Sequence, residues 1–192
     1  NHKDGVERLK DVEALTLSGM EGKISFDLSL EKRIALIETN QNDIKQITNE
    51  LRQAVTPSIK KNRLFIQKHC SKILILSGGF KEIIIPIVSE YGINEDQIFA
   101  NEFIYDSDGN VIGIDKNNNM SKKSGKILMI KSLNLSGNID VIGDGFTDYE
   151  IKKSGLATNF YAFIENINRD EISQLSDKVL NSFDDYIEIV ND

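Results

Sequence analysis

The chain has 192 residues, of which 40% are hydrophobic and 28% are charged, a composition typical of a globular protein and not of a disordered one. Its 30 acidic side chains exceed its 23 basic ones, giving a formal net charge of −7, which argues against nucleic acid and anionic membranes as main partners. One cysteine, no stretch near 18 apolar residues and no apolar leader predict a cytoplasmic protein without membrane span or signal peptide.

The first third of the chain is predicted to be helical. Apolar side chains recur every three or four residues over 6–15, 26–37 and 44–55, the spacing that places them on one helix face. Gly19 ends the first run. Pro57 ends the third, because the residue before a proline disfavours the helical conformation. We expect these amphipathic helices to pack on one another.

The pattern changes after about residue 58. Short apolar runs at 73–76, 140–142 and 160–164 predict strands that are buried on both faces, with helices between them. Strands that alternate with helices indicate an α/β fold, in which a parallel sheet carries helices on both faces. Residues 98–104 and 111–114 flank a turn sequence and are predicted to form a hairpin.

Three loops lie where ligands bind in such sheets, at the points where strands end and helices begin. The first is Ser-Gly-Gly at 77–79, after a predicted strand. The second is Ser-Gly-Lys at 124–126, which opens a predicted helix. The third is Gly-Asp-Gly-Phe-Thr-Asp at 143–148, again after a strand.

The first two loops carry groups that suit an anion. The Ser77 hydroxyl can donate to a phosphoryl oxygen, and the glycines after it let backbone N–H groups approach the same anion. Lys126 stands in the first turn of a helix, where the helix dipole disfavours a cation, and a bound anion would remove that conflict. The alternatives are an ordinary turn and a solvated lysine, since Lys122, Lys123 and Lys131 offer the same residue type.

The third loop carries two carboxylates four residues apart, Asp144 and Asp148. They are hard oxygen ligands, and Mg²⁺ usually takes one or two carboxylates together with substrate phosphate. The alternative is one helix-capping and one turn aspartate. Asp106, Asp108 and Asn110 fit the start of an EF-hand loop, but the required glycine and glutamate are absent, so we exclude that site.

The order of these three motifs resembles that of the haloacid dehalogenase-like (HAD) hydrolases, and within them the phosphoserine phosphatase family. The resemblance extends over about residues 10–164, and 20–33 is similar to the helical cap of that family. It implies a helical cap over 1–56 and a HAD-like Rossmannoid α/β core over 57–192. A flap hairpin is expected near 98–115.

The resemblance also implies roles for individual residues around a phosphoryl group. Ser77 and the Gly78 N–H would hold the phosphoryl group, and Thr147 would face it. Lys126 would bridge the phosphate and the nucleophile. Ser77 and Lys126 are therefore the expected catalytic residues of this chain.

The metal site and the substrate pocket follow in the same way. The resemblance implies that Asp144 ligates Mg²⁺ and that Asp148 supports the metal site. In the cap, Arg33 would pair with a substrate carboxylate, a bidentate contact that suits a guanidinium. Phe26 would help to close the pocket.

The implied activity is Mg²⁺-dependent hydrolysis of a small phosphomonoester, first of all O-phosphoserine, through an aspartyl-phosphate. The Asp-x-Asp-x-Thr nucleophile motif of the family has no counterpart, because Asp106-Ser107-Asp108 lies after the cap. We expect this motif upstream of Asn1, or else a relative that lacks it. The alternatives are a phosphatase for another small carboxylate-bearing phosphate and a non-catalytic fragment that binds phosphate or protein. The oligomeric state is not predicted.

Overall fold

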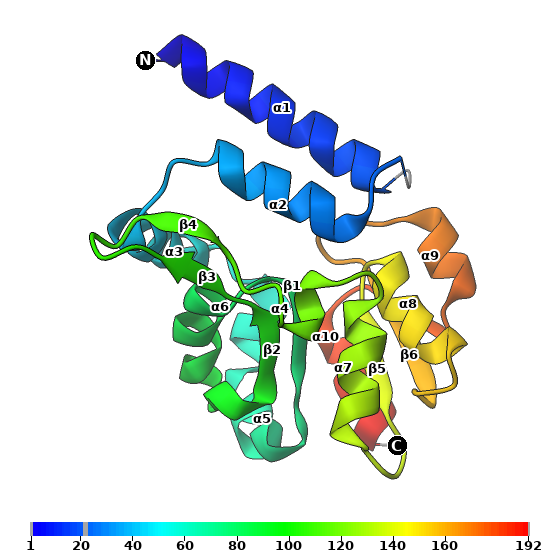
Figure 1. Ribbon diagram of the computed structural model, residues 1–192. Helices are drawn as coiled ribbons and strands as arrows, with labels where there is room; N and C mark the ends of the chain where they lie inside the picture. Colours follow the sequence, from blue (N-terminus) through cyan, green and yellow to red (C-terminus); the bar gives the residue numbers. More distant parts are fainter. Residues whose placement is uncertain (1, 21–22, 192) are drawn as a thin grey trace.

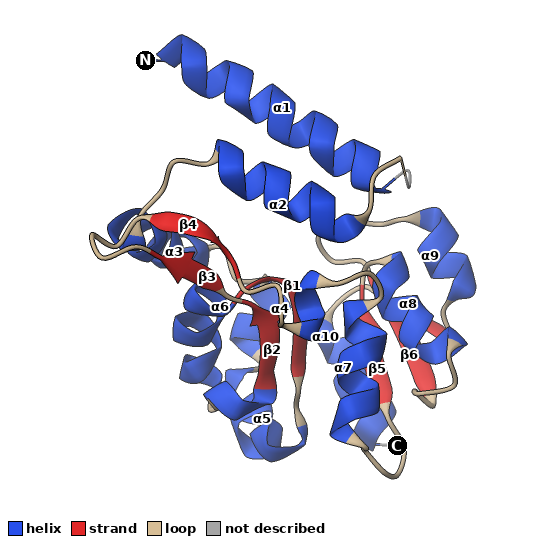
Figure 2. Ribbon diagram, in the orientation of Figure 1, coloured by secondary structure: helices blue, strands red, loops and turns tan. Residues whose placement is uncertain are grey.

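The computed structural model of the chain describes residues 2–20 and 23–191 (Figure 1). The described chain is helical up to the first strand at residue 75, and strands and helices are interspersed from there on (Figure 2). The strands are β1 (Ile75–Phe80), β2 (Ile98–Asn101), β3 (Phe103–Tyr105), β4 (Val111–Ile114), β5 (Asp140–Gly143), β6 (Asn159–Phe163) and β7 (Lys178–Leu180).

The helices α3 and α4 begin at residues that favour helix starts. Asn40 caps α3, since its side chain accepts from the N–H groups of Asn42 and Asp43, and Pro57 occupies the first turn of α4. Among the described residues no helix is long and apolar enough to cross a membrane. The α-helices are α1 (His2–Met20), α2 (Phe26–Leu36), α3 (Gln41–Gln53), α4 (Pro57–Lys61), α5 (Arg63–His69), α6 (Lys81–Val88), α7 (Gly125–Leu133), α8 (Phe146–Lys153), α9 (Asp170–Leu175) and α10 (Phe183–Asn191). The short 3₁₀ helices are η1 (Cys70–Lys72), η2 (Ser89–Tyr91), η3 (Glu95–Gln97) and η4 (Asn119–Ser121).

The α/β part contains two separate parallel sheets. In the first, β1 pairs with β2, with Ile75 opposite Ile98. In the second, β5 pairs with β6 and β6 with β7, with Asp140 opposite Asn159. α6 packs on the first sheet, whereas α7 and α8 pack together beside the second. This arrangement confirms the predicted α/β class with parallel strands and covering helices.

β1 and β5 are less buried than β2 and β6, the strands with which they pair. β2 contains the buried Ile98 and Ala100, and β6 contains the buried Phe160 and Ala162. By contrast, no residue of β1 or β5 is fully buried. Strands of a parallel sheet are normally covered on both faces. β1 and β5 each pair on one side only, so both are edges.

The helices α1 and α2 pack against each other at the top of the molecule in Figure 1. The Ser29 hydroxyl donates to the Leu15 carbonyl at 2.8 Å and joins the two helices. Leu30 and Ile34 of α2 are buried with Ile114 of the hairpin. α3 packs instead against α6. The division between cap and core at residue 56 stays a prediction.

The single strand expected over 98–104 is in fact two strands. Residues 98–101 pair in parallel with β1, and only from Phe103 does the chain pair with β4 to form the hairpin. The polar pair Asn101-Glu102 interrupts the apolar run at this boundary, and the expectation did not take it into account. The Glu82 carboxylate accepts from the Phe103 N–H at 2.9 Å, where the second strand begins.

Two further elements differ from the expectation. β1 continues to Phe80, so residues 77–79 lie inside an irregular part of the strand and not after it. The strand β7 was not predicted, because Lys-Val-Leu at 178–180 is too short to show a period. It pairs with β6 through tertiary contacts, which no local pattern reveals.

Candidate active site

The irregular part of β1 holds its backbone through neutral hydrogen bonds. The Ser77 Oγ accepts from the Gly79 N–H at 3.0 Å. The side-chain amide of Asn101, the last residue of β2, donates to the Gly78 carbonyl at 2.8 Å. The regular β-sheet pairing is interrupted here, but these two hydrogen bonds still fix the Gly78–Gly79 peptide group. The half-buried Ser77 hydroxyl lies next to it.

At the starts of α7 and α8, Lys126 and Asp148 form an ion pair. The Lys126 Nζ lies 2.6 Å from Asp148 Oδ1, and the two side chains are only 16% and 14% exposed. Lys126 is the second residue of α7, whose first residue, Gly125, has no room for a side chain because a Cβ there would meet the backbone of η4. The expected lysine thus lies in the first turn of its helix, as predicted, and is shielded from most solvent.

Asp148 also organises its own loop. Its second carboxylate oxygen accepts from the Gly145 N–H at 3.3 Å, at the start of α8. A side chain at Gly143 would collide with the Asp148 carboxylate, so this glycine is required by close packing. Asp148 therefore acts both as a helix cap and as the partner of Lys126.

Asp144 lies at the end of β5 and is 49% exposed. Arg169, the residue before α9, pairs with its carboxylate and also donates to its main-chain carbonyl at 2.9 Å. Arg169 could not be found from a motif, because it lies 25 residues from Asp144 in a loop without one. Thr147, in the first turn of α8, is exposed.

Asp144 and Asp148 could contribute ligands to a magnesium site that substrate phosphate completes, with carboxylates that here pair with Arg169 and Lys126. Carboxylate oxygens are hard ligands, and Mg²⁺ commonly takes one or two carboxylates and several waters. Among the described residues no three His, Cys, Asp or Glu side chains converge, so a cage made of protein ligands alone is not present. Asp144 is the accessible carboxylate of the pair.

The only hydrogen bond found for Arg33 among the described residues is to its own helix, and not to the three loops. Arg33 is half-buried on α2, and its Nε donates to the Ser29 carbonyl at 3.4 Å. Burial lowers the pKa of the Arg33 guanidinium. α2 packs against η4, which leads into α7, so this helix lies over the Lys126 side of the site. Phe26 begins α2, but its side chain lies outside the described part of the structure.

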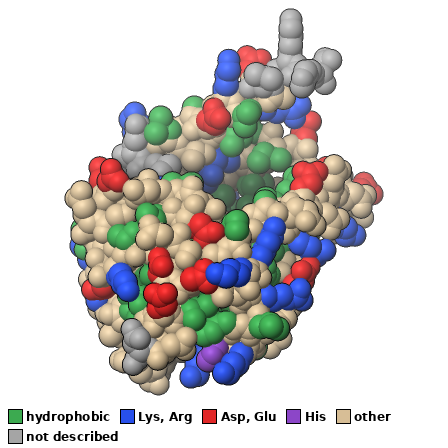
Figure 3. All heavy atoms as spheres, turned by 180° about the vertical axis from the view of Figure 1, so that it is seen from behind, with side chains coloured by type: hydrophobic (Ala, Val, Ile, Leu, Met, Phe, Trp, Pro, Cys, Tyr) green, Lys and Arg blue, Asp and Glu red, His purple; other side chains and the backbone are tan. Residues whose placement is uncertain are grey.

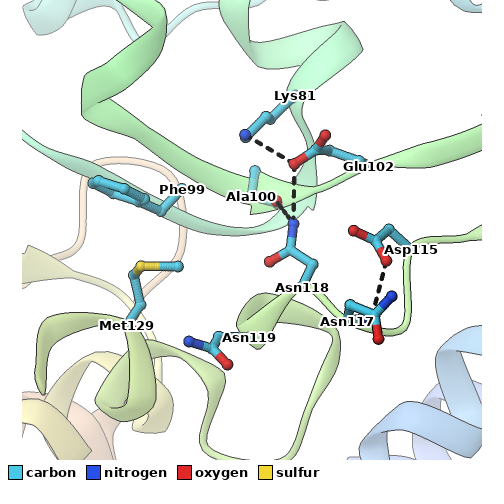
Figure 4. Close-up of a pocket in the computed structure, with 9 residues that line it drawn as sticks. All are labelled: Lys81, Phe99, Ala100, Glu102, Asp115, Asn117, Asn118, Asn119 and Met129. Carbon is cyan, nitrogen blue, oxygen red and sulfur yellow. Dashed lines mark hydrogen bonds and ion pairs between the residues drawn. The ribbon is translucent and has the colours of Figure 1, made fainter. Parts of the chain in front are cut away.

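Two hollows lie on the described part of the structure, and none of the expected site residues lines either of them. A small one of about 290 Å³ lies beside β2, and its charged and amide groups bond one another (Figure 4). Lys81 pairs with Glu102 at 2.8 Å, and Asn118 donates to the Ala100 carbonyl at 2.8 Å. The polar groups of this hollow tie β2 to the segment that leads into α7.

The larger hollow, of about 560 Å³, is a groove between α2 and the β3–β4 hairpin. Ile34, Ile37 and Ile112 are among the apolar residues that line it, and Glu31 and Lys116 lie at its polar edge. Figure 3 shows apolar side chains in the hollow between the upper helices and the body of the molecule. The groove borders the helix that carries Arg33.

Comparisons with known proteins identify the family of this chain. No family model matches the chain. The phosphoserine phosphatase of Methanocaldococcus jannaschii is 33% identical over 169 residues, which cover 82% of this chain and 74% of that protein. The chain belongs to the phosphoserine phosphatase family. The resemblance found in the motifs is thereby confirmed.

A solved structure supports the family and the HAD-like fold. The phosphoserine phosphohydrolase-like protein of Francisella tularensis superposes with a TM-score of 0.79 at 31% identity, over 98% of this chain and 88% of that one. The chloroplastic phosphoserine phosphatase of Arabidopsis thaliana is 26% identical over 93% of this chain. The chain spans only 61% of the length of that family member.

Proposed function

We propose that this chain is the larger part of a cytoplasmic, Mg²⁺-dependent phosphatase that hydrolyses O-phosphoserine to serine and phosphate. The observation that carries the proposal is the shielded pair of Lys126 and Asp148. Lys126 lies in the first turn of α7, and its motif follows the Ser77 loop along the chain in the order of the family. A cation held in place and shielded from water is suited to stabilise a phosphoryl group.

Each residue has a separate task in this proposal. The Ser77 hydroxyl and the Gly78 N–H bind phosphoryl oxygens, and Lys126 neutralises charge that develops as the ester bond breaks. Asp148 fixes Lys126, while Asp144 and Asp148 hold Mg²⁺, with Thr147 beside the phosphate. When bound, Mg²⁺ supplies positive charge to the phosphoryl oxygens.

The nucleophile is proposed to come from a segment outside these 192 residues. A carboxylate oxygen would attack phosphorus, the serine oxygen would leave with a proton, and water would then hydrolyse the acyl phosphate. The incomplete burial of β1 and β5, which are both edge strands, supports this proposal. In the proposal, a strand from the segment that carries the nucleophile would lie between them and pair with both.

Substrate selection is proposed to involve the cap. Arg33 would pair with the substrate carboxylate, and Phe26 with the apolar groove would close the pocket over a small molecule. Residues 1–56 would then act as cap and 57–192 as core, with the hairpin near 98–115 as flap. An acidic surface does not oppose an anionic ligand here, because Lys126, Arg33 and Mg²⁺ neutralise it locally.

The test uses the extended chain, which we define as these 192 residues together with the residues that the gene encodes before Asn1. Phosphate release is measured with O-phosphoserine and with phosphoethanolamine, which lacks the carboxylate, in Mg²⁺ and in excess chelator. We expect turnover that depends on Mg²⁺ and favours O-phosphoserine. Equal turnover of both esters would favour a phosphatase for another phosphate, and no turnover would favour a binding fragment.

Arg33→Ala sharpens this test. We expect it to raise KM for O-phosphoserine about tenfold or more, since a charge-assisted pair is lost, and to change KM for phosphoethanolamine little. Lys32→Ala, an exposed neighbour on α2, is the matched control. Equal losses on both esters would contradict a role for Arg33 in carboxylate recognition.

A further inference from the structure

Asn101 is a buried polar residue at the start of the expected flap region, and the resemblance assigns it no role. It is the last residue of β2 and is 0% exposed. Its amide nitrogen donates to the Gly78 carbonyl at 2.8 Å. Its amide oxygen is buried without a hydrogen-bond partner among the described residues. Burying an acceptor without a partner costs free energy. The hydrogen bond of the amide nitrogen to Gly78 is therefore the contact in which we look for the role of this side chain.

The amide compensates for a break in the β1–β2 ladder. Leu76 lies opposite Phe99, and Phe80 lies opposite Asn101. Three residues of β1, 77–79, therefore face one residue of β2, so the strand bulges and loses its regular pairing. The Asn101 side chain supplies a donor to the bulge where the backbone ladder no longer can.

The contact fixes one particular peptide group. The Gly78 carbonyl and the Gly79 N–H belong to the same peptide plane, which rotates as a unit. Asn101 holds the carbonyl end, and the N–H end donates to the Ser77 Oγ at 3.0 Å. A hydroxyl has one proton and two lone pairs. With one lone pair of Ser77 engaged by this N–H, its proton remains available for another acceptor.

We propose that Asn101 is a positioning residue that acts through Ser77: it fixes the Gly78–Gly79 peptide so that the Ser77 hydroxyl donates to a bound phosphoryl group. The role rests on the proposed function of the Ser77 loop. Without the Asn101 amide, the peptide can turn, its N–H leaves the Ser77 oxygen, and the hydroxyl loses its fixed direction.

The structure offers a matched control at the opposite end of the same sheet. Gln97 lies directly before β2, and its amide donates at 2.7 Å to the carbonyls of Cys70 and Ile73, just before β1. Gln97 and Asn101 thus both tie the β1 segment to β2 through a side-chain amide. Only Asn101 does so at the Ser77 loop.

The experiment compares Asn101→Ala, Gln97→Ala, Ser77→Ala and the double variant Asn101→Ala/Ser77→Ala in the extended chain. Thermal unfolding, binding of inorganic phosphate by calorimetry, and KM and kcat for O-phosphoserine are measured. We expect both amide variants to lower Tm, but only Asn101→Ala to weaken phosphate binding, about ten- to hundredfold, the weight of one hydrogen bond to a charged group. The double variant should bind phosphate no more weakly than Ser77→Ala alone.

Two results would overturn the role of Asn101 while leaving the proposed function intact. One is phosphate binding by Asn101→Ala equal to that by Gln97→Ala, and the other is losses that multiply in the double variant. If Asn101→Ala does not fold, Asn101→Ser tests the same point, because its hydroxyl is one bond too short to replace the amide. Failure of the unaltered extended chain to bind phosphate would overturn the proposed function itself.

Discussion

The two parallel sheets hold their parts of the site by different forces. At β1 the Ser77 loop is fixed by neutral hydrogen bonds, from the Gly79 N–H and from Asn101. At β5 the groups are charged, with Lys126 paired to Asp148 and Arg169 paired to Asp144. In the proposed function, the first sheet would set the geometry of phosphate binding and the second would supply charge.

Lys126→Ala in the extended chain should cause the largest loss, because it removes a cation from a shielded position. We expect kcat for O-phosphoserine to fall about 10²–10³-fold, as when a fixed electrostatic group is removed from an active site. Lys131→Ala, an exposed lysine of the same helix, is the control. Similar rates for the two variants would place the charge of the site elsewhere.

Asp144→Asn should have a smaller effect, since the amide keeps the size of the side chain but is a poorer ligand for a hard cation. We expect the Mg²⁺ concentration for half-maximal activity to rise about tenfold or more. Titration of Mg²⁺ by calorimetry checks the same change without turnover. The control is Asp170→Asn, which changes an exposed carboxylate beside Arg169 and should leave both measurements unchanged. An Mg²⁺ titration of Asp144→Asn that matches the unaltered protein would show that Asp144 is not a metal ligand.

The two sheets should also differ in the pH dependence of stability. Burial raises the pKa of Glu82, which ties α6 to the hairpin beside the first sheet. In the second sheet, the Phe160 N–H lowers the pKa of Asp177. Ionisation of Glu82 therefore lowers the free energy of unfolding. This loss is absent below the ordinary carboxyl pKa and is complete above the raised pKa of Glu82. Ionised Asp177 adds stability above its ordinary pKa, which is lost as the pH falls through its lowered value.

Denaturant unfolding from about pH 3 to about pH 8 tests these opposite signs. Glu82→Gln should stabilise the protein at the high end of the series and have little effect at the low end. Asp177→Asn should destabilise it at the high end, with a smaller loss at the low end. A destabilising Glu82→Gln at high pH would mean that its hydrogen bond outweighs the burial of its charge.

The sequence predicted the parts of the site that lie in short, local motifs. Ser77, Lys126 and Asp148 follow from loops in which residue type and the start of a helix coincide, and the pair between Lys126 and Asp148 brings two of these motifs together. Asn101 and Arg169 could not be predicted in this way. Each contacts a loop about 25 residues distant in the chain, and no local pattern carries such a pairing.

The same limit applies to the fold. Alternating apolar runs predicted the α/β class and most helices, but strand order arises from pairing over long separations. The division into a β1–β2 sheet and a β5–β6–β7 sheet was therefore visible only in the structure. So was the short strand β7, which owes its conformation to β6 and not to its own residues.

The central claim is that the two sheets form one phosphatase site only when a strand that carries the nucleophile lies between β1 and β5. Its most direct test is phosphate release from O-phosphoserine with Mg²⁺, measured side by side for the 192-residue chain and the extended chain. The account predicts no detectable turnover by the first, and turnover together with a higher Tm for the second. Robust turnover by the 192-residue chain, with its mass verified, would contradict it and require a nucleophile among the residues described here.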